Sequence, residues 1–129
     1  MKDTPYVVAL YTRMSKEDDD VGLFGNKEES NSITNQRMLL YDYLNTHPEF
    51  QGYEVVEFCD DGFSGKRMDR PQFNEMMDCV RIGKINCIIV KDFSRFCRDY
   101  IEIGNYLEQL FPFMGIRFIA VTDNYDSKD

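Results

Sequence analysis

The chain of 129 residues has the length of a single domain, and its formal net charge is -8. An apolar fraction of 43%, with 10 Phe and 8 Tyr residues, supports a packed core and excludes a globally disordered chain. The acidic balance argues against a domain that holds DNA through its overall charge, because that affinity comes from Lys and Arg side chains that neutralise phosphates.

The cysteines and the single histidine, His47, form no sequence pattern typical of a zinc site. No two of the four cysteines stand in a C-x-x-C pair, and three of them lie in or beside apolar runs, where a reduced thiol is usual. The sequence has no signal peptide and no apolar run near the roughly 20 residues that span a bilayer. We therefore expect a cytoplasmic protein that uses neither a metal nor another cofactor.

The first apolar run predicts a buried strand over residues 6–14, in the centre of a sheet. A polar stretch over residues 16–31 follows, with two glycines and an acidic run. Its length is typical of a functional loop. Ser32 can cap a helix that extends to about Thr46.

A second strand is predicted over residues 53–59, and a glycine-punctuated loop follows it. Asp60 and Asp61 are interpreted as turn formers at the start of this loop, and their role in a site is left open. Pro71 lies near the first position of a helical apolar pattern that ends near Gly83. Residues 85–90 are a short continuous apolar run, as expected of a parallel strand covered on both faces. The basic segment 91–98 begins directly at the end of this run.

Helical spacing over residues 99–113, broken by Pro112 and Gly115, and a fourth apolar strand over 116–121 complete the pattern. Strands that alternate with helices predict an α/β fold with a doubly wound, mostly parallel sheet and flanking helices. In such sheets ligands bind beyond the carboxyl ends of the strands. Polar side chains follow three of these predicted ends, namely Arg13 and Ser15, Ser64 and Arg70, and Lys91, Arg95 and Arg98.

Arg13 and Ser15 are two residues apart at the end of the first strand. Because side chains alternate with a period of two along a strand, both can face one site. A serine hydroxyl beside a fixed positive charge suits attack on a phosphate, whose anionic transition state needs cationic donors in place.

Taken together, these motifs resemble the catalytic domain of the serine recombinases, a family of resolvases, DNA invertases, large serine integrases and transposases. The resemblance covers nearly the whole chain, with the motifs in the right order and at compatible spacing. It rests on Tyr11-x-Arg13-x-Ser15, on Gln36, on Asp61-Gly62-Phe63-Ser64-Gly65 with Asp69-Arg70-Pro71, and on Lys91-Asp92-Phe93-Ser94-Arg95-Phe96-x-Arg98-Asp99.

The resemblance implies that Ser15 attacks a DNA phosphodiester, forms a 5′-phosphoserine link and frees a 3′-hydroxyl. After strand exchange this hydroxyl attacks the phosphoserine and reseals the DNA without ATP. The implied partners are a double-stranded DNA crossover site and further copies of the protein, as a homodimer on each site and a homotetramer in synapsis. The residues implied to hold the phosphate are Arg13, Arg70, Arg95 and Arg98, supported by Gln36, Ser64 and Lys91.

Two departures from the small resolvases favour the large serine recombinases of the transposase or integrase kind. Small members have an aspartate before the arginine that matches Arg95, whereas this chain has Ser94 there and Asp92 two residues earlier. This chain also has a long insertion between Ser15 and Gln36. In the family a long interface helix and DNA-binding domains follow the core, so we expect residues 1–129 to be a catalytic-domain fragment.

Two other functions are compatible with this fold. A receiver-like signalling domain is also doubly wound, but it needs an acidic pair at the end of the first strand to hold Mg²⁺, where this chain has Arg13 and Ser15. A noncatalytic assembly module of the same fold is disfavoured because the serine and the arginines are all present. Magnesium binding and a Ser15-dependent DNA adduct discriminate between the three functions.

Overall fold

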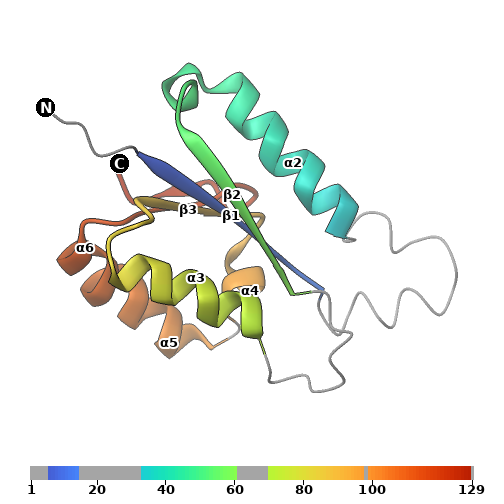
Figure 1. Ribbon diagram of the computed structural model, residues 1–129. Helices are drawn as coiled ribbons and strands as arrows, with labels where there is room; N and C mark the ends of the chain where they lie inside the picture. The colour runs from blue at the N-terminus through green and yellow to red at the C-terminus, as the bar shows by residue number, and fades with distance from the viewer. Residues whose placement is uncertain (1–5, 15–32, 61–69, 98, 129) are drawn as a thin grey trace, which may run out of the picture.

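A computed structural model describes residues 6–14, 33–60, 70–97 and 99–128. Its centre is a five-stranded sheet in the order β2-β1-β3-β4-β5 (Figure 1). Strands β1 to β4 are parallel to one another, and the edge strand β5 pairs antiparallel with β4. The strands are β1 (Val7–Arg13), β2 (Glu54–Asp60), β3 (Cys87–Val90), β4 (Arg117–Ala120) and β5 (Tyr125–Asp126).

This sheet confirms the predicted fold class and the four predicted strands. β1 lies between β2 and β3, as expected of a strand without polar residues over most of its length. β5 was not predicted, because two residues are too few for a periodic pattern. The chain reaches β5 through a tight turn in which Asn124 has a φ of 56°, a left-handed conformation that asparagine tolerates better than most residues.

The predicted helices are also present. They are α2 (Ile33–Thr46), α3 (Pro71–Arg81), and a continuous helical segment made of α5 (Tyr100–Asn105), η3 (Tyr106–Leu110) and α6 (Phe111–Met114). The short helices η2 (Pro48–Phe50) and α4 (Phe93–Phe96) were not predicted. Within the described ranges, no helix combines the length and apolarity that crossing a membrane requires.

The segment 100–114 runs through Pro112, where the sequence predicted a break. η3 is a π-helical turn, in which the N–H of Phe111 donates to the carbonyl of Tyr106. This turn changes the hydrogen-bonding register just before Pro112, which has no N–H to donate. The helix ends at Gly115, the other predicted break, whose φ of 73° is readily adopted by glycine.

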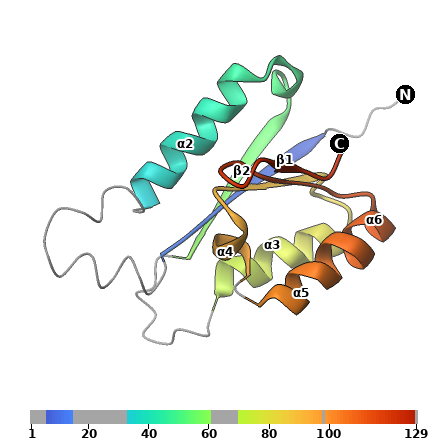
Figure 2. The same ribbon diagram turned by 180° about the vertical axis from the view of Figure 1, so that it is seen from behind.

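The helices form two unequal layers on the sheet. α2 covers one face, and α3, α4 and the segment α5 to α6 cover the other (Figures 1 and 2). Alternate residues of β1 enter the two cores: Leu10 packs in the cluster with Leu40 of α2, and Tyr11 packs in the cluster with Phe73 of α3. Arg13 has the same parity as Tyr11, which places its side chain on the α3 and α4 face.

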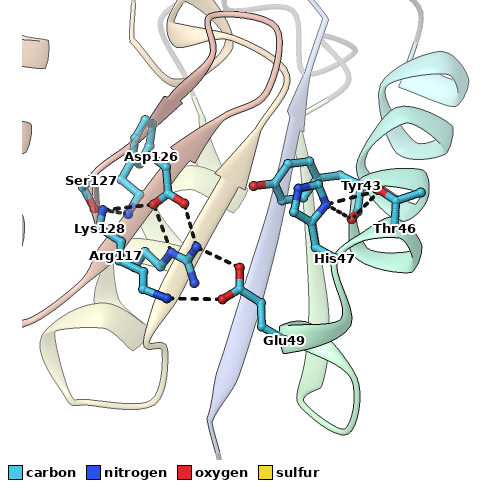
Figure 3. A network of polar contacts seen from close by, with 9 residues as sticks. Tyr43, Thr46, His47, Glu49, Arg117, Asp126, Ser127 and Lys128 are labelled. Carbon is cyan, nitrogen blue, oxygen red and sulfur yellow. Dashed lines mark hydrogen bonds and ion pairs between the residues drawn. The ribbon is translucent and has the colours of Figure 1, made fainter.

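A polar network at the amino end of β4 fixes β5 to the sheet (Figure 3). Arg117 donates from Nε and Nη2 to the two carboxylate oxygens of Asp126, at 3.0 and 2.6 Å. It also donates to Glu49 at 3.1 Å, and Glu49 accepts from Lys128 at 3.3 Å. The hydrogen bonds that Arg117 donates to Asp126 raise the pKa of Arg117 above its usual value and lower the pKa of Asp126. This network is a structural clamp.

Candidate active site

The carboxyl ends of β1 and β3 adjoin at the point where the sheet changes direction. The chain passes from β1 to β2 on one side and then crosses to β3 on the other side of β1. In open α/β sheets such a switch point opens a crevice that binds ligands. Arg13 ends β1, and α4 with Arg95 begins three residues after β3 ends, so the two arginines lie at this point.

Arg13 and Arg95 hold each other through their main chains. The Nε of Arg13 donates to the carbonyl of Arg95 at 3.0 Å, and Nη1 of Arg95 donates to the carbonyl of Arg13 at 3.1 Å. A further N–H of Arg13 donates to the carbonyl of Ser94. Two parallel N–H groups on a planar guanidinium give a fixed orientation, which a lysine ammonium cannot reproduce. The ends of β1 and α4 are thereby joined by two cationic side chains.

Gln36 fixes the main chain of Arg13 from the opposite face of the sheet. Its side-chain oxygen accepts from the N–H of Arg13 at 3.2 Å, and its amide nitrogen donates to the carbonyl of Arg13 at 3.0 Å. Gln36 is 1% exposed on α2. The predicted supporting role of Gln36 thus has a geometric basis, because the amide satisfies both main-chain groups at the residue where β1 ends.

Arg70 reaches the same region from the start of α3. It is the N-cap residue of this helix and is half-buried. Its Nη1 donates to the carbonyl of Phe96 at 2.5 Å, and its guanidinium lies 3.7 Å from the centroid of the Phe73 ring. The contact with Phe96 connects Arg70 to α4, the helix that carries Arg95. Three of the predicted phosphate ligands are therefore anchored to one short helix.

Asp60 was treated as a turn former in the sequence, with an open role in the site, but it is a buried hub. It ends β2, is 7% exposed, and its Oδ2 accepts from the Tyr11 hydroxyl at 2.6 Å. Its two carboxylate oxygens also accept from the N–H groups of Gln72 and Phe73, each at 3.0 Å. Burial raises the pKa of Tyr11 above its usual value, so this hydroxyl remains a donor. The sequence signal that could have indicated this role was an aspartate directly after an apolar strand and before the next predicted helix.

Other predicted residues are less informative or lie outside the described ranges. The carbonyl of Lys91 accepts from the N–H of Thr122 at 2.8 Å, which connects the ends of β3 and β4. Ser15, Ser64 and Arg98 lie outside the described residues, and their predicted roles stay predictions.

Among the residues that are described, no three His, Cys, Asp or Glu side chains lie close enough to hold a metal ion.

Two cavities in the described part of the chain lie away from these arginines. One, of about 340 Å³, borders the Arg117 network, with His47 and Tyr125 in its lining. The other, of about 360 Å³, lies between β2 and the end of α3. Neither includes Arg13, Arg70 or Arg95, and a crevice that binds a DNA phosphate is an open surface rather than an enclosed pocket. We therefore locate the candidate site from the arginine contacts.

Comparison with known families decides the assignment. The sequence model described as "Resolvase, N terminal domain" matches residues 8–129. The chain belongs to this family. Its members include the catalytic domains of site-specific recombinases that act on DNA, which confirms the resemblance drawn from the motifs. A search of curated protein sequences gives no significant match.

Solved structures of serine recombinases have the fold of this resolvase-family domain. A resolvase family site-specific recombinase from Streptococcus pneumoniae is 30% identical, with a TM-score of 0.75, over 96% of this chain and 77% of the other. The catalytic domain of an IS607-like serine recombinase, ISC1926 TnpA, is 26% identical, with a TM-score of 0.59, over 90% and 69%. The catalytic domain of TP901-1 integrase is 22% identical and shares the fold, with a TM-score of 0.70 over 95% and 82%.

The departure at Ser94 has a local explanation in this resolvase-family domain. Asp92 caps α4: its Oδ1 accepts from the N–H of Arg95 at 3.2 Å and from the Ser94 hydroxyl at 2.6 Å. A carboxylate is thus present at the start of α4, two residues before the position that carries aspartate in the small resolvases. The Ser94 hydroxyl donates to this carboxylate, which also accepts from the N–H of Arg95.

Proposed function

We propose that this domain cleaves DNA with Ser15 as the nucleophile. The Ser15 Oγ attacks the phosphorus of a phosphodiester, and the bond from phosphorus to the 3′ oxygen breaks. The products are a 5′-phosphoserine and a strand that ends in a 3′-hydroxyl. The reverse attack by a 3′-hydroxyl after strand exchange releases Ser15 and reseals the DNA, so the energy of the broken bond is kept in the covalent link.

The observation that carries this proposal is the reciprocal contact between Arg13 and Arg95 at the switch point of the sheet. The pentavalent transition state carries negative charge on its phosphoryl oxygens, and preorganised donors stabilise it most because they need no rearrangement during the reaction. Arg13 is held rigidly two residues before Ser15 in the sequence. Guanidinium groups also favour the alkoxide form of a nearby serine.

We assign the phosphate-binding role to Arg13, Arg70, Arg95 and Arg98. Arg70 is half-buried and sits at an N-cap, which suits direct contact with a phosphate oxygen. Arg95 is 4% exposed and fixes the Arg13 main chain as well as adding positive charge. Gln36 positions Arg13, and Ser64 and Lys91 are proposed to support the phosphate from the two neighbouring strand ends.

We further propose that residues 1–129 are the catalytic domain of a longer protein of the large serine recombinase type. The net charge of -8 supports DNA-binding domains outside this chain, because the domain itself offers little general affinity for phosphates. A DNA substrate and four free cysteines are consistent with the cytoplasm. Ile101 and Phe113 are 77% and 88% exposed, and exposed apolar side chains of this kind suit contacts between subunits of a dimer on each site and a tetramer in synapsis.

The direct test uses the complete recombinase and a crossover site that is labelled at the 3′ end of the cleaved strand. The label then stays on the segment whose 5′ phosphate becomes joined to Ser15. The reaction is stopped with denaturant, and label that migrates with protein is measured. We expect an adduct for the wild type and none for Ser15→Ala, with site binding equal in both. A noncatalytic assembly module predicts no adduct despite demonstrated synapsis, and an adduct that survives Ser15→Ala contradicts the assignment of the nucleophile.

A further inference from the structure

Asp60 lies where three elements of the site meet. It ends β2, and its main-chain carbonyl accepts from the N–H of Met14, just beyond the end of β1, at 3.0 Å. Its side chain binds the Tyr11 hydroxyl of β1 and the first two free N–H groups of α3, on Gln72 and Phe73. The carboxylate thus ties the end of β1, the end of β2 and the start of α3 together.

The start of α3 has no local cap of the usual kind. Arg70 is its N-cap residue, and the Arg70 side chain makes no hydrogen bond to the helix. N-cap positions normally carry a short side chain that accepts from the first turn. Here Asp60 supplies that acceptor from another strand, and a carboxylate also matches the positive end of the helix dipole. Because the capping duty is met by Asp60, the Arg70 side chain is available for another role.

The same contacts determine where the Arg70 guanidinium lies. Phe73 donates its N–H to Asp60, and its ring lies 3.7 Å from the guanidinium carbon of Arg70. The Phe73 ring also makes edge contacts with Tyr11, at a centroid distance of 5.6 Å, and with Phe96 at 5.1 Å. Phe96 in turn provides the carbonyl that accepts from Arg70. Asp60 therefore holds Phe73, whose ring contacts the Arg70 guanidinium, and Tyr11, whose ring packs against Phe73.

We propose that Asp60 is a positioning residue for DNA cleavage, which acts by placing Arg70 against the scissile phosphate through the start of α3 and the Phe73 ring. This inference depends on the proposed phosphate-binding role of Arg70. In this proposal Asp60 acts through other residues and not by direct contact with the DNA. Its contribution is orientation, and a misplacement of about 1 Å in a catalytic group can lower a rate on the order of 10²-fold.

The test measures the single-turnover rate of adduct formation by the complete recombinase. The crossover site is saturated with protein, and the temperature is below the melting temperature of every variant. Asp60→Asn keeps the side-chain volume but replaces one acceptor oxygen with a donor that faces the Tyr11 hydroxyl or a helix N–H. We expect its rate to fall on the order of 10²-fold with unchanged site binding. Asp126→Asn is the matched control, a carboxylate in the clamp at the far end of the sheet, and it should cleave at the wild-type rate even where its melting temperature is lower.

A merely structural role for Asp60 is distinguished by combining the change with Arg70→Lys, which keeps a cation and a measurable rate. If Asp60 acts through Arg70, Asp60→Asn slows the Arg70→Lys enzyme little further, because the group it positions is already lost. Losses that multiply in the double variant, or a wild-type rate for Asp60→Asn, overturn the proposal. Normal cleavage by Arg70→Lys alone overturns the proposed role of Arg70, and with it the route through which Asp60 acts.

Tyr11→Phe provides a second variant in case Asp60→Asn does not fold. It removes one of the three donors to the carboxylate and leaves both helix N–H groups bound. We expect a several-fold lower cleavage rate that disappears in the Arg70→Lys background. A wild-type rate for a folded Tyr11→Phe enzyme contradicts the proposed route from β1 to Arg70.

Discussion

At the carboxyl ends of the strands, the described hydrogen bonds of Arg13, Arg70 and Arg95 go to main-chain carbonyls, whereas Arg117 at the amino end of β4 donates to two carboxylates. A carbonyl oxygen carries no net charge, so it orients a guanidinium without neutralising it. A carboxylate both orients the group and cancels its charge. Arg70, oriented by the carbonyl of Phe96, thus suits phosphate chemistry at one end of the sheet, whereas Arg117, paired with carboxylates, suits stability at the other.

The largest expected effect is on catalysis at the carboxyl end. Arg70→Ala removes a cation aimed at the transition state, and we expect adduct formation to fall by about 10²–10³-fold, as for other single donors of this kind. Stability should change little, because the side chain is half-buried and anchored mainly by one carbonyl. Quench-flow cleavage and thermal melting measure the two effects. Cleavage at the wild-type rate would contradict the proposed phosphate-binding role of Arg70.

At the amino end the same kind of change should affect stability and leave chemistry intact. Asp126→Asn weakens the clamp to Arg117, and we expect a loss of about 1.5–3 kcal/mol in the free energy of unfolding at pH 7, typical of a hydrogen bond between charged groups. Urea unfolding measures this loss. An accompanying fall in the cleavage rate at a temperature where the variant is folded would contradict the division between the two ends.

The pH dependence of this loss has a definite sign. The hydrogen bond from Arg117 lowers the pKa of Asp126 below its usual value of 3.8. The stabilisation is therefore complete above pH 3.8 and is lost as the pH falls through the lower pKa of the folded state. The difference in unfolding free energy between the wild type and Asp126→Asn should shrink in that range. A constant difference down to acid unfolding would mean that the charge of Asp126 contributes nothing.

Gln36→Ala should reveal how far the two faces of the sheet are coupled. The change removes the Gln36 amide from the part-buried N–H and carbonyl of Arg13, while the carbonyl keeps its hydrogen bond from Nη1 of Arg95, and we expect a cost of about 1–3 kcal/mol. We expect lower stability in urea together with slower cleavage, since Arg13 loses its fixed main chain. Lower stability with a wild-type cleavage rate, measured at a temperature where the variant is folded, would argue that Gln36 does not position Arg13.

The smallest effect concerns the carboxylate at the start of α4. Asp92→Ala removes the cap of this helix and the partner of the Ser94 hydroxyl, at a cost of about 1 kcal/mol. The N–H of Arg95 loses the Asp92 carboxylate as an acceptor, and Arg95 is then held less firmly. A modest fall in the cleavage rate should therefore accompany the lower melting temperature. Ser94→Ala keeps the cap and is the control. Equal effects of the two changes would mean that the cap is not the important contact.

The sequence predicted the sheet and the strand ends that carry the candidate site residues, but it did not predict how these residues are held. Apolar runs and their spacing define β1, β3 and α3 directly, because burial determines which residues can occupy them. The Arg13 and Arg95 contact involves residues 82 positions apart, and main-chain carbonyls have no sequence signature. For the same reason Asp60 resembled a turn residue, although its partners lie on β1 and α3. The roles of Ser15, Ser64 and Arg98 still depend on the family motifs.

The most direct test of the account is to identify the residue that carries the DNA. The complete recombinase is trapped on its crossover site with denaturant, the DNA is digested to a short nucleotide, and the protein is cleaved and analysed by mass spectrometry. We predict that the added mass lies on Ser15 and that Arg117→Ala protein, once folded, gives the same modified peptide. A nucleotide on Ser64, Ser94 or any other residue would contradict the assignment of the carboxyl end of β1 as the catalytic centre.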